Sequence, residues 1–322
     1  MGRPEEGIPP ELRPDPREWG FDVDRALQAV AALRAVVPDD AFTAGTLGTE
    51  RAGSAVHVRD GLLLTVGYLI TEASEVWLRF SNGSVVPGHA LAFDHATGFG
   101  LVQALGKVSA PVLELGDSRR VRAGEPVIVA AAGGLPASIA AKIGGRQEFA
   151  GYWEYLIEDA LFTLPAHPFW GGAAVIGTSG TLVGVGSLVL QQGGEAHRVD
   201  LNMAIPTQAL LPIFDDLLRY GRVNRPARPW LGLYAMDDDD ALVVGGLADG
   251  GPADQAGVRT GDRILAVDET EVPDLAGLWR AVWASGSAGS VVTLTLGRGT
   301  RAVQIQVRSG DRMRFLKAPP MH

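Results

Sequence analysis

Short apolar segments at regular spacing dominate the chain from about residue 52 to residue 205. Turn signals separate them, among them Arg59-Asp60-Gly61, Ser81-Asn82-Gly83 and Ala123-Gly124-Glu125. The predicted strands are residues 54–58, 62–65, 76–80, 89–93, 100–104, 126–131, 139–143, 181–190 and 202–205. Many short strands joined by tight turns are typical of a β-barrel or a β-sandwich.

Helical spacing of apolar residues is found in three places. The first predicted helix is capped by Asp22 and runs to about Val36, and the second covers residues 206–220 with Leu210, Ile213 and Leu217 on one face. The third covers residues 274–283 in a compact unit of further strands that begins at Trp230. Residues 221–229 are basic and rich in proline, which is typical of a linker.

Composition and charge exclude several classes of function. The formal net charge of the 322 residues is −9, and no basic stripe interleaved with aromatic residues is present, so we expect no nucleic-acid partner. No segment is apolar for the roughly 18 residues that a membrane span needs. There is no cysteine, hence no disulfide framework and no thiolate site. Residues 1–16 contain no apolar signal core, so we predict a cytoplasmic protein, or a periplasmic one if an export signal was removed.

Five segments of the first part resemble the protease domain of the HtrA/Deg family, in the family's order. The segment GSAVHVRDGLLLTVGYL (residues 53–69) is similar to G-S-G-x-x-x-x-x-D-G-x-I-L-T-x-x-H-V, and DHATGFGLV (94–102) is similar to D-x-x-x-D-L-A-V-L. LGDS (115–118) matches L-G-D-S, PFWGGAAV (168–175) is similar to G-N-S-G-G-P-L-V, and NMAIP (202–206) resembles F-A-I-P. The resemblance implies a trypsin-like double β-barrel.

The last part resembles a PDZ domain. GPADQAGVRTGDRILAVD (residues 251–268) is similar to the family's S-P-A-x-x-A-G-L-x-x-G-D-x-I-L-x-V-N, and Trp230-Leu231-Gly232-Leu233 resembles its carboxylate-binding loop. Such a loop holds the carboxylate of a peptide C-terminus while the peptide pairs with a sheet edge. The residues expected to bind the peptide are Trp230, Leu231, Gly232 and Leu233, with Leu278 and Val282 opposite or in the core.

The expected fold is mostly β: a trypsin-like double β-barrel, then an α+β PDZ domain, with an N-terminal helical arm. The expected domains are residues 1–40 for the arm and helix, 41–221 for the trypsin-like domain, 222–229 for the linker, 230–310 for the PDZ domain and 311–322 for a tail.

The resemblance also aligns the catalytic positions. The base position holds Tyr68, the orienting carboxylate position holds Gly98, the nucleophile position holds Trp170, and an oxyanion-hole donor position holds Pro168. Tyrosine is a poor base at neutral pH, glycine has no side chain, the indole has no nucleophilic atom, and proline has no N–H. We therefore predict a pseudoprotease that is not an enzyme. Tyr68 and Trp170 either fill the vacated cleft or stack against a ligand.

Other residues could supply a rearranged site. His57 is expected on a strand, whereas His95 lies beside the carboxylate position and His167 beside the nucleophile loop. Ser179 falls in a predicted turn. His95 and His167 have no third ligand in their spacing, so we predict no metal and no cofactor.

Three hypotheses of function follow. The first is a non-catalytic homologue that binds peptides, protein C-termini or unfolded segments through its PDZ domain, as a scaffold, adaptor or chaperone. The second is a serine endopeptidase with a rearranged active site. The third is a structural subunit of a homo-oligomeric assembly, and analogy with the family suggests a homotrimer.

Overall fold

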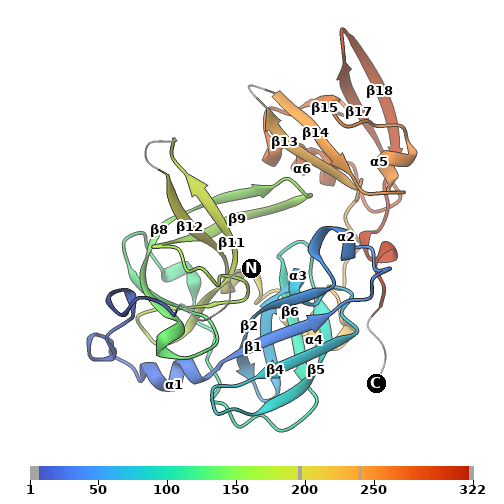
Figure 1. Ribbon diagram of the computed structural model, residues 1–322. Coiled ribbons are helices and arrows are strands. Elements are labelled where there is room, and N and C mark those ends of the chain that lie inside the picture. The colour runs from blue at the N-terminus through green and yellow to red at the C-terminus, as the bar shows by residue number, and fades with distance from the viewer. Residues whose placement is uncertain (1–6, 195–197, 239–240, 319–322) are drawn as a thin grey trace. The chain divides into compact units, whose positions relative to one another are not determined.

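The computed structural model describes residues 7–194, 198–238 and 241–318. The chain forms two compact units (Figure 1). The first comprises residues 1–147, 159–223 and 317–322, and the second comprises residues 148–158 and 224–316. The segment 148–158 thus belongs with the C-terminal residues, although its sequence neighbours lie in the first unit.

Two closed antiparallel barrels build the first unit. One has the strand order β1-β2-β3-β6-β5-β4 and the other β10-β11-β12-β9-β8-β7. The first contains β1 Val30–Val36, β2 Glu50–Arg59, β3 Leu62–Val66, β4 Glu75–Arg79, β5 Val85–Phe93 and β6 Phe99–Ala104. The second contains β7 Pro126–Ala130, β8 Ser138–Gly151, β9 Tyr155–Leu164, β10 Ala174–Ile176, β11 Leu182–Gln192 and β12 Val199–Pro206. The expected double barrel is confirmed.

Short helices precede, connect and follow these strands. They are η1 Pro10–Leu12, η2 Pro16–Glu18, α1 Val23–Gln28, α2 Ala44–Leu47, α3 Gly67–Ile70, η3 Ser118–Arg120, η4 Leu135–Ala137, η5 Thr207–Ala209 and α4 Phe214–Tyr220. The predicted helix over residues 206–220 is therefore two shorter helices, and its apolar residues Leu210, Ile213 and Leu217 are buried as expected. None of the helices among the described residues combines the length and the apolar character that crossing a membrane requires.

The helix predicted from Asp22 to Val36 is wrong beyond Gln28. Asp22 caps α1 through its side chain, but the chain then becomes strand β1. This strand pairs with β2 on one side and β4 on the other, and it closes the first barrel. Barrel closure outweighs the intrinsic helix preference of the alanines in this segment. Residues 30–36 are part of the barrel, so the expected domain boundary near residue 41 is also wrong.

The second unit contains a sheet, the helices α5 and α6, and the short helix η6. Its sheet order is β13-β14-β15-β17-β18, with β16 paired to β15. The elements are β13 Leu233–Asp238, β14 Ala241–Leu247, α5 Pro252–Gln255, β15 Arg263–Val267, β16 Thr270–Glu271, α6 Leu275–Ala284, β17 Val291–Arg298, β18 Arg301–Arg308 and η6 Arg312–Phe315. The α+β prediction is confirmed, and α6 begins and ends within one residue of the predicted 274–283 helix.

Residues 311–316 are not a separate tail. The rings of Phe315, in η6, and Trp230 lie 4.6 Å apart between centroids, and Trp230 exchanges two backbone hydrogen bonds with Gly310. These contacts make residues up to 316 part of the second unit.

Candidate functional site

Tyr68, at the predicted base position, lies in α3 directly after β3. Its side chain is half-buried, and its hydroxyl donates a hydrogen bond to the carbonyl oxygen of Ser187 at 2.9 Å. Burial raises the pKa of the Tyr68 phenol well above its usual value, and the Trp170 side chain opposes this rise only in part. The phenol is therefore protonated at neutral pH and serves as a hydrogen-bond donor.

Gly98, at the predicted carboxylate position, lies beside the start of α3. Its carbonyl oxygen accepts a hydrogen bond from the N–H of Gly67 at 2.7 Å. Its own N–H donates to the carbonyl oxygen of Asp94, and its φ of 84° is one that glycine adopts readily. The carboxylate of Asp94 accepts hydrogen bonds from the N–H and hydroxyl of Thr97, so it stabilises the turn that contains Gly98.

The loop around Trp170, at the predicted nucleophile position, is held by its backbone. The carbonyl oxygen of Gly171 accepts from the N–H of Ser54 at 2.8 Å, and the N–H of Gly172 donates to Gly186 at 2.9 Å. Gly172 has a φ of 76°, and a Cβ there would lie 1.9 Å from the carbonyl oxygen of Ser54. Trp170 itself is half-buried, and Pro168 is exposed.

The fold brings these predicted positions together. A Cβ on Gly171 would lie 3.0 Å from the Tyr68 hydroxyl, so the phenol packs against the loop that carries Trp170. Gly98 joins the group through its bond to Gly67. The described groups here are a protonated phenol, an indole and backbone amides. Their alignment with a catalytic triad stays a prediction.

His57 and His167 are buried, and backbone groups bind both of their rings. Nε2 of His57 accepts from the N–H of Gly61 at 3.1 Å, while its Nδ1 faces the carbonyl oxygens of Ala110 and Pro111. Nδ1 of His167 accepts from the N–H of Phe169, and its Nε2 faces the carbonyl oxygen of Ala137. Burial lowers the pKa of His167. Both rings stabilise local backbone.

The other candidates lie in different surroundings. The hydroxyl of Ser179 is 2.8 Å from that of Thr181 in an exposed turn, as turn chemistry predicts. The ring of His95 packs edge-on against Phe93, with centroids 4.8 Å apart. Within residues 7–194, 198–238 and 241–318, no group of three His, Asp or Glu side chains is arranged to hold a metal ion.

The predicted carboxylate-binding loop, Trp230 to Leu233, leads into β13. Gly232 has a φ of 71°, and a Cβ there would lie 3.1 Å from the Cβ of Ala248. This backbone turns consecutive N–H groups toward one point. The side chains of Leu231 and Leu233, which belong to this loop, are buried.

Leu278 and Val282, expected opposite the peptide pocket, are fully buried in the core of the second unit. Ala150, from the segment that precedes β9, packs against the same core. Their role as pocket residues stays a prediction.

The sequence prediction missed Glu154. The N–H groups of the carboxylate-binding loop donate to its carboxylate: Leu231 at 3.1 Å, Gly232 at 2.8 Å and Leu233 at 3.2 Å, all to Oε1. Glu154 lies in the turn between β8 and β9, far from the loop in sequence. The only local signal is a glutamate between aromatic residues, and many exposed hairpins share that feature.

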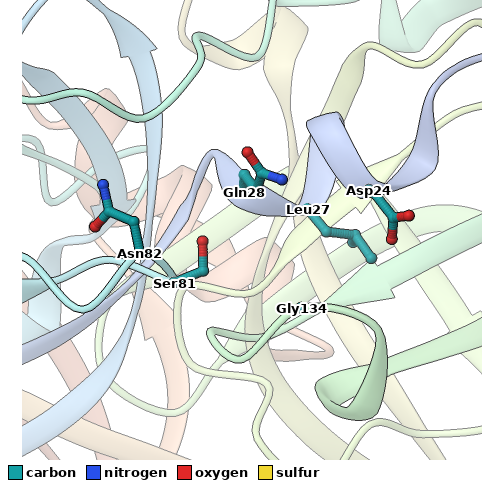
Figure 2. Close-up of a pocket in the computed structure, with 6 residues that line it drawn as sticks. All are labelled: Asp24, Leu27, Gln28, Ser81, Asn82 and Gly134. Carbon is teal, nitrogen blue, oxygen red and sulfur yellow. The ribbon is translucent and has the colours of Figure 1, made fainter.

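A separate pocket on the first unit is lined by Asp24, Leu27, Gln28, Ser81, Asn82 and Gly134 (Figure 2). Asp24 is the one charged residue of this lining, and none of the six belongs to the predicted catalytic or peptide-binding positions. A single carboxylate among amides and a hydroxyl supplies no catalytic pair.

Two family models match the chain. Residues 53–185 match a trypsin-like peptidase domain, and residues 229–308 match a PDZ domain.

Curated relatives align with most of the chain. "Serine protease Do-like HtrA" of Lactobacillus helveticus is 24% identical over 294 residues, which cover 82% of this chain and 70% of the relative. "Probable periplasmic serine endoprotease DegP-like" proteins of Pseudomonas fluorescens and Rhizobium meliloti are 25% and 26% identical, over 86% and 85% of this chain. The chain spans 58% and 56% of the length of these two relatives.

Solved structures share the fold. "HtrA-type protease AlgW with decapeptide" has a TM-score of 0.53 at 21% identity, and the match covers 92% of this chain and 98% of that one. The serine endoprotease from Yersinia pestis has a TM-score of 0.52 at 21% identity, with 90% and 96% covered. At this identity the likeness shows a common fold.

These relatives correct one prediction. From the side chains at Tyr68, Gly98, Trp170 and Pro168 we predicted that the chain is not an enzyme. The curated relatives are named serine proteases or serine endoproteases, which contradicts that prediction. It was wrong to infer the class of the whole protein from the side chains of one site.

Proposed function

Because this chain is an HtrA-type protein, with a trypsin-like peptidase domain followed by a PDZ domain, we propose that it binds peptides or unfolded segments of other proteins through the PDZ domain. The bound segment lies along β13, and its C-terminal carboxylate is held by the carboxylate-binding loop. Strand addition of this kind takes its affinity from main-chain hydrogen bonds and its specificity from side-chain pockets.

The observation that supports this proposal is the geometry of the loop. Three successive N–H groups, of Leu231, Gly232 and Leu233, lie within 3.2 Å of one carboxylate oxygen, Oε1 of Glu154. Hydrogen bonds from backbone N–H groups to a carboxylate are stronger than those between neutral groups. A loop with this geometry is suited to a carboxylate, which a peptide C-terminus also carries. One structural neighbour is an HtrA-type protease with a decapeptide.

The test is selection of C-terminal peptides on the full chain. We expect enrichment of apolar C-terminal residues and micromolar affinity, equivalent to about 8 kcal/mol. Each selected peptide is compared with its C-terminal amide, which cannot ionise. Binding that is equal for the acid and the amide, or no enrichment at all, would contradict the proposal.

The names of the relatives favour proteolysis as a second candidate activity. Trp170 has no nucleophilic atom and burial keeps Tyr68 protonated, so a serine endopeptidase built on this chain needs a nucleophile elsewhere. Labelling with a fluorophosphonate, together with a quenched peptide library, tests this. Hydrolysis that the label blocks, with one serine modified, supports the activity. An unlabelled chain that cuts no peptide contradicts it.

The compartment of this chain is proposed from the names of the relatives. Two are named as periplasmic, which favours the periplasm over the cytoplasm for this chain. The homotrimer stays a proposal from family analogy. Cell fractionation and analytical ultracentrifugation test these two proposals, and a cytoplasmic fraction or a monomer would contradict them.

A further inference from the structure

The turn of the β8–β9 hairpin is part of the second unit. Its tip, residues 148–158, is grouped with the PDZ residues. Glu154 has a φ of 56°, which side-chain-bearing residues adopt infrequently. Its side chain is only 8% exposed. A charged residue in a hairpin turn is ordinarily solvated, so the burial of Glu154 needs a specific partner.

That partner is the carboxylate-binding loop. Oε1 of Glu154 accepts from all three N–H groups named above, and Oε2 accepts from Leu231 at 3.3 Å. Every one of these donors would otherwise be available to the carboxylate of a bound peptide. Glu154 therefore occupies the N–H donors that the proposed function assigns to a peptide C-terminus.

The backbone of the tip also forms hydrogen bonds of the kind expected for a bound peptide. Two residues before Glu154, the carbonyl oxygen of Tyr152 accepts from the N–H of Ala235, in β13, at 2.9 Å. One residue earlier, the carbonyl oxygen of Gly151 accepts from Nε1 of Trp279, in α6, at 2.8 Å. The tip is thus hydrogen-bonded to both β13 and α6, the strand and helix between which a peptide is expected to lie.

Charged side chains of the PDZ residues interact with the tip at both of its ends. Burial raises the pKa of Glu154, and the guanidinium of Arg312 opposes this rise in part. Burial lowers the pKa of Arg312, and the carboxylate of Glu154 opposes this fall in part. Burial raises the pKa of Tyr234, in β13, and the negative charge of Glu154 adds to this rise. At the far end of the tip, Glu148 forms an ion pair with Arg280, in α6.

We propose that the tip of the β8–β9 hairpin is an internal ligand of the PDZ domain, that the Glu154 side chain replaces a free α-carboxylate, and that a C-terminal peptide binds only by displacing it. The displacement step rests on the proposed function, in which the loop binds the C-terminus of another protein. The occupancy of the loop by Glu154 does not depend on it.

Displacement has a measurable cost. When only a fraction of molecules is competent to bind, the apparent Kd is the intrinsic Kd divided by that fraction. A tip docked in about nine of ten molecules weakens external binding about tenfold. Removal of the Glu154 carboxylate therefore strengthens peptide binding by about tenfold or more.

The experiment uses the full chain with two readouts. Hydrogen exchange at the amides of Leu231, Gly232 and Leu233 reports whether the loop is occupied, without any peptide. Titration with an apolar peptide, as free acid and as amide, reports external binding. The variants are Glu154→Ala, Glu154→Asp and the matched control Glu158→Gln, which changes an exposed glutamate in β9 of the same hairpin.

We expect the three amides to be protected in the wild type and in Glu158→Gln, and to exchange at least about tenfold faster in Glu154→Ala. Glu154→Asp keeps the charge but is one methylene shorter, so intermediate protection is expected, and this variant serves if Glu154→Ala does not fold. The free-acid peptide should bind the alanine variant more tightly than the wild type.

Equal protection of the three amides in the wild type and in both Glu154 variants would overturn the inference. If the amides lose protection in the alanine variant but the free acid binds neither protein, the internal ligand is supported and the proposed function fails. Equal peptide affinity for the wild type and the alanine variant, with protection lost, would overturn the displacement step.

Discussion

Substitution of Gly172 by alanine tests the rigidity of the loop that carries Trp170. An added Cβ would lie 1.9 Å from the carbonyl oxygen of Ser54 and 2.7 Å from Oγ1 of Thr65. These two groups are themselves hydrogen-bonded to each other at 2.7 Å in a buried position. Since the first contact is with backbone, the strand β2 and the loop must move apart.

The magnitude follows from two contributions. A left-handed φ costs a residue with a Cβ about 1–2 kcal/mol, and Gly172 has a φ of 76°. Disruption of a buried hydrogen bond adds about 1–3 kcal/mol. We therefore expect Gly172→Ala to destabilise the trypsin-like domain by about 3 kcal/mol. In a domain of this size that corresponds to a decrease in Tm of roughly 6–12 °C.

The assay is thermal unfolding of the full chain, followed by near-ultraviolet circular dichroism. Gly171→Ala is the matched control, because a Cβ there would contact only the Tyr68 side chain, with its hydroxyl at 3.0 Å, and Gly171 does not have a left-handed φ. We expect the control to lower Tm by less than about 3 °C. Equal effects of the two substitutions, or no effect of Gly172→Ala, would refute the reasoning.

Three further predictions concern single side chains. Tyr68→Phe removes the hydrogen bond to the Ser187 carbonyl and should lower the free energy of unfolding by about 1 kcal/mol, measured by chemical denaturation. Asp262→Ala should destabilise the PDZ domain by about 2–3 kcal/mol in thermal unfolding, because Asp262 is 2% exposed and paired with Arg298. Arg298 lowers the pKa of Asp262. In the wild type the stabilisation by this pair is therefore present above about pH 4 and is lost as pH falls through the lowered pKa. Burial raises the pKa of Glu154 from 4.5 to about 7, so between these pH values the docked tip binds a proton that the undocked tip has lost, and docking weakens as pH rises. Protection of the loop amides, corrected for intrinsic exchange, should therefore fall from about pH 4.5 to about pH 7, and a rise would contradict this.

The PDZ domain could be predicted from the sequence because its signals are local. The glycines and apolar residues of 251–268 follow one another at fixed spacing, and α6 has its cap, Asp274, and its buried face within a few turns. Each of these features is set by neighbours in the chain. The structure therefore has the helix within one residue of its predicted bounds.

The strand β1 could not be predicted in the same way. Residues 30–36 are alanine, valine, leucine and arginine, which suit a helix as well as a strand. Only pairing with β2 and β4, far along the chain, makes them a strand. The alternating burial of Ala31, Leu33 and Ala35 is visible once the barrel is formed.

The role of Glu154 depends on longer-range contacts still. Its partners lie about 77 residues further along, and a carboxylate in a hairpin turn is usually solvated. The sequence predicts the loop that binds a carboxylate, but not the carboxylate that the chain itself supplies. The hairpin turn that carries Glu154 and the carboxylate-binding loop are each common local structures, and they contact one another only after both have folded.

The central claim is that the carboxylate-binding loop holds the C-terminus of a partner. The most direct measurement follows the amide resonance of Gly232 in the full chain during titration with an apolar peptide, added first as the free acid and then, in a separate sample, as the amide. The account predicts that the free acid shifts the Gly232 resonance in a saturable manner and that the amide leaves it in place. An unchanged resonance at saturating free acid, or the same shift with both peptides, would contradict it.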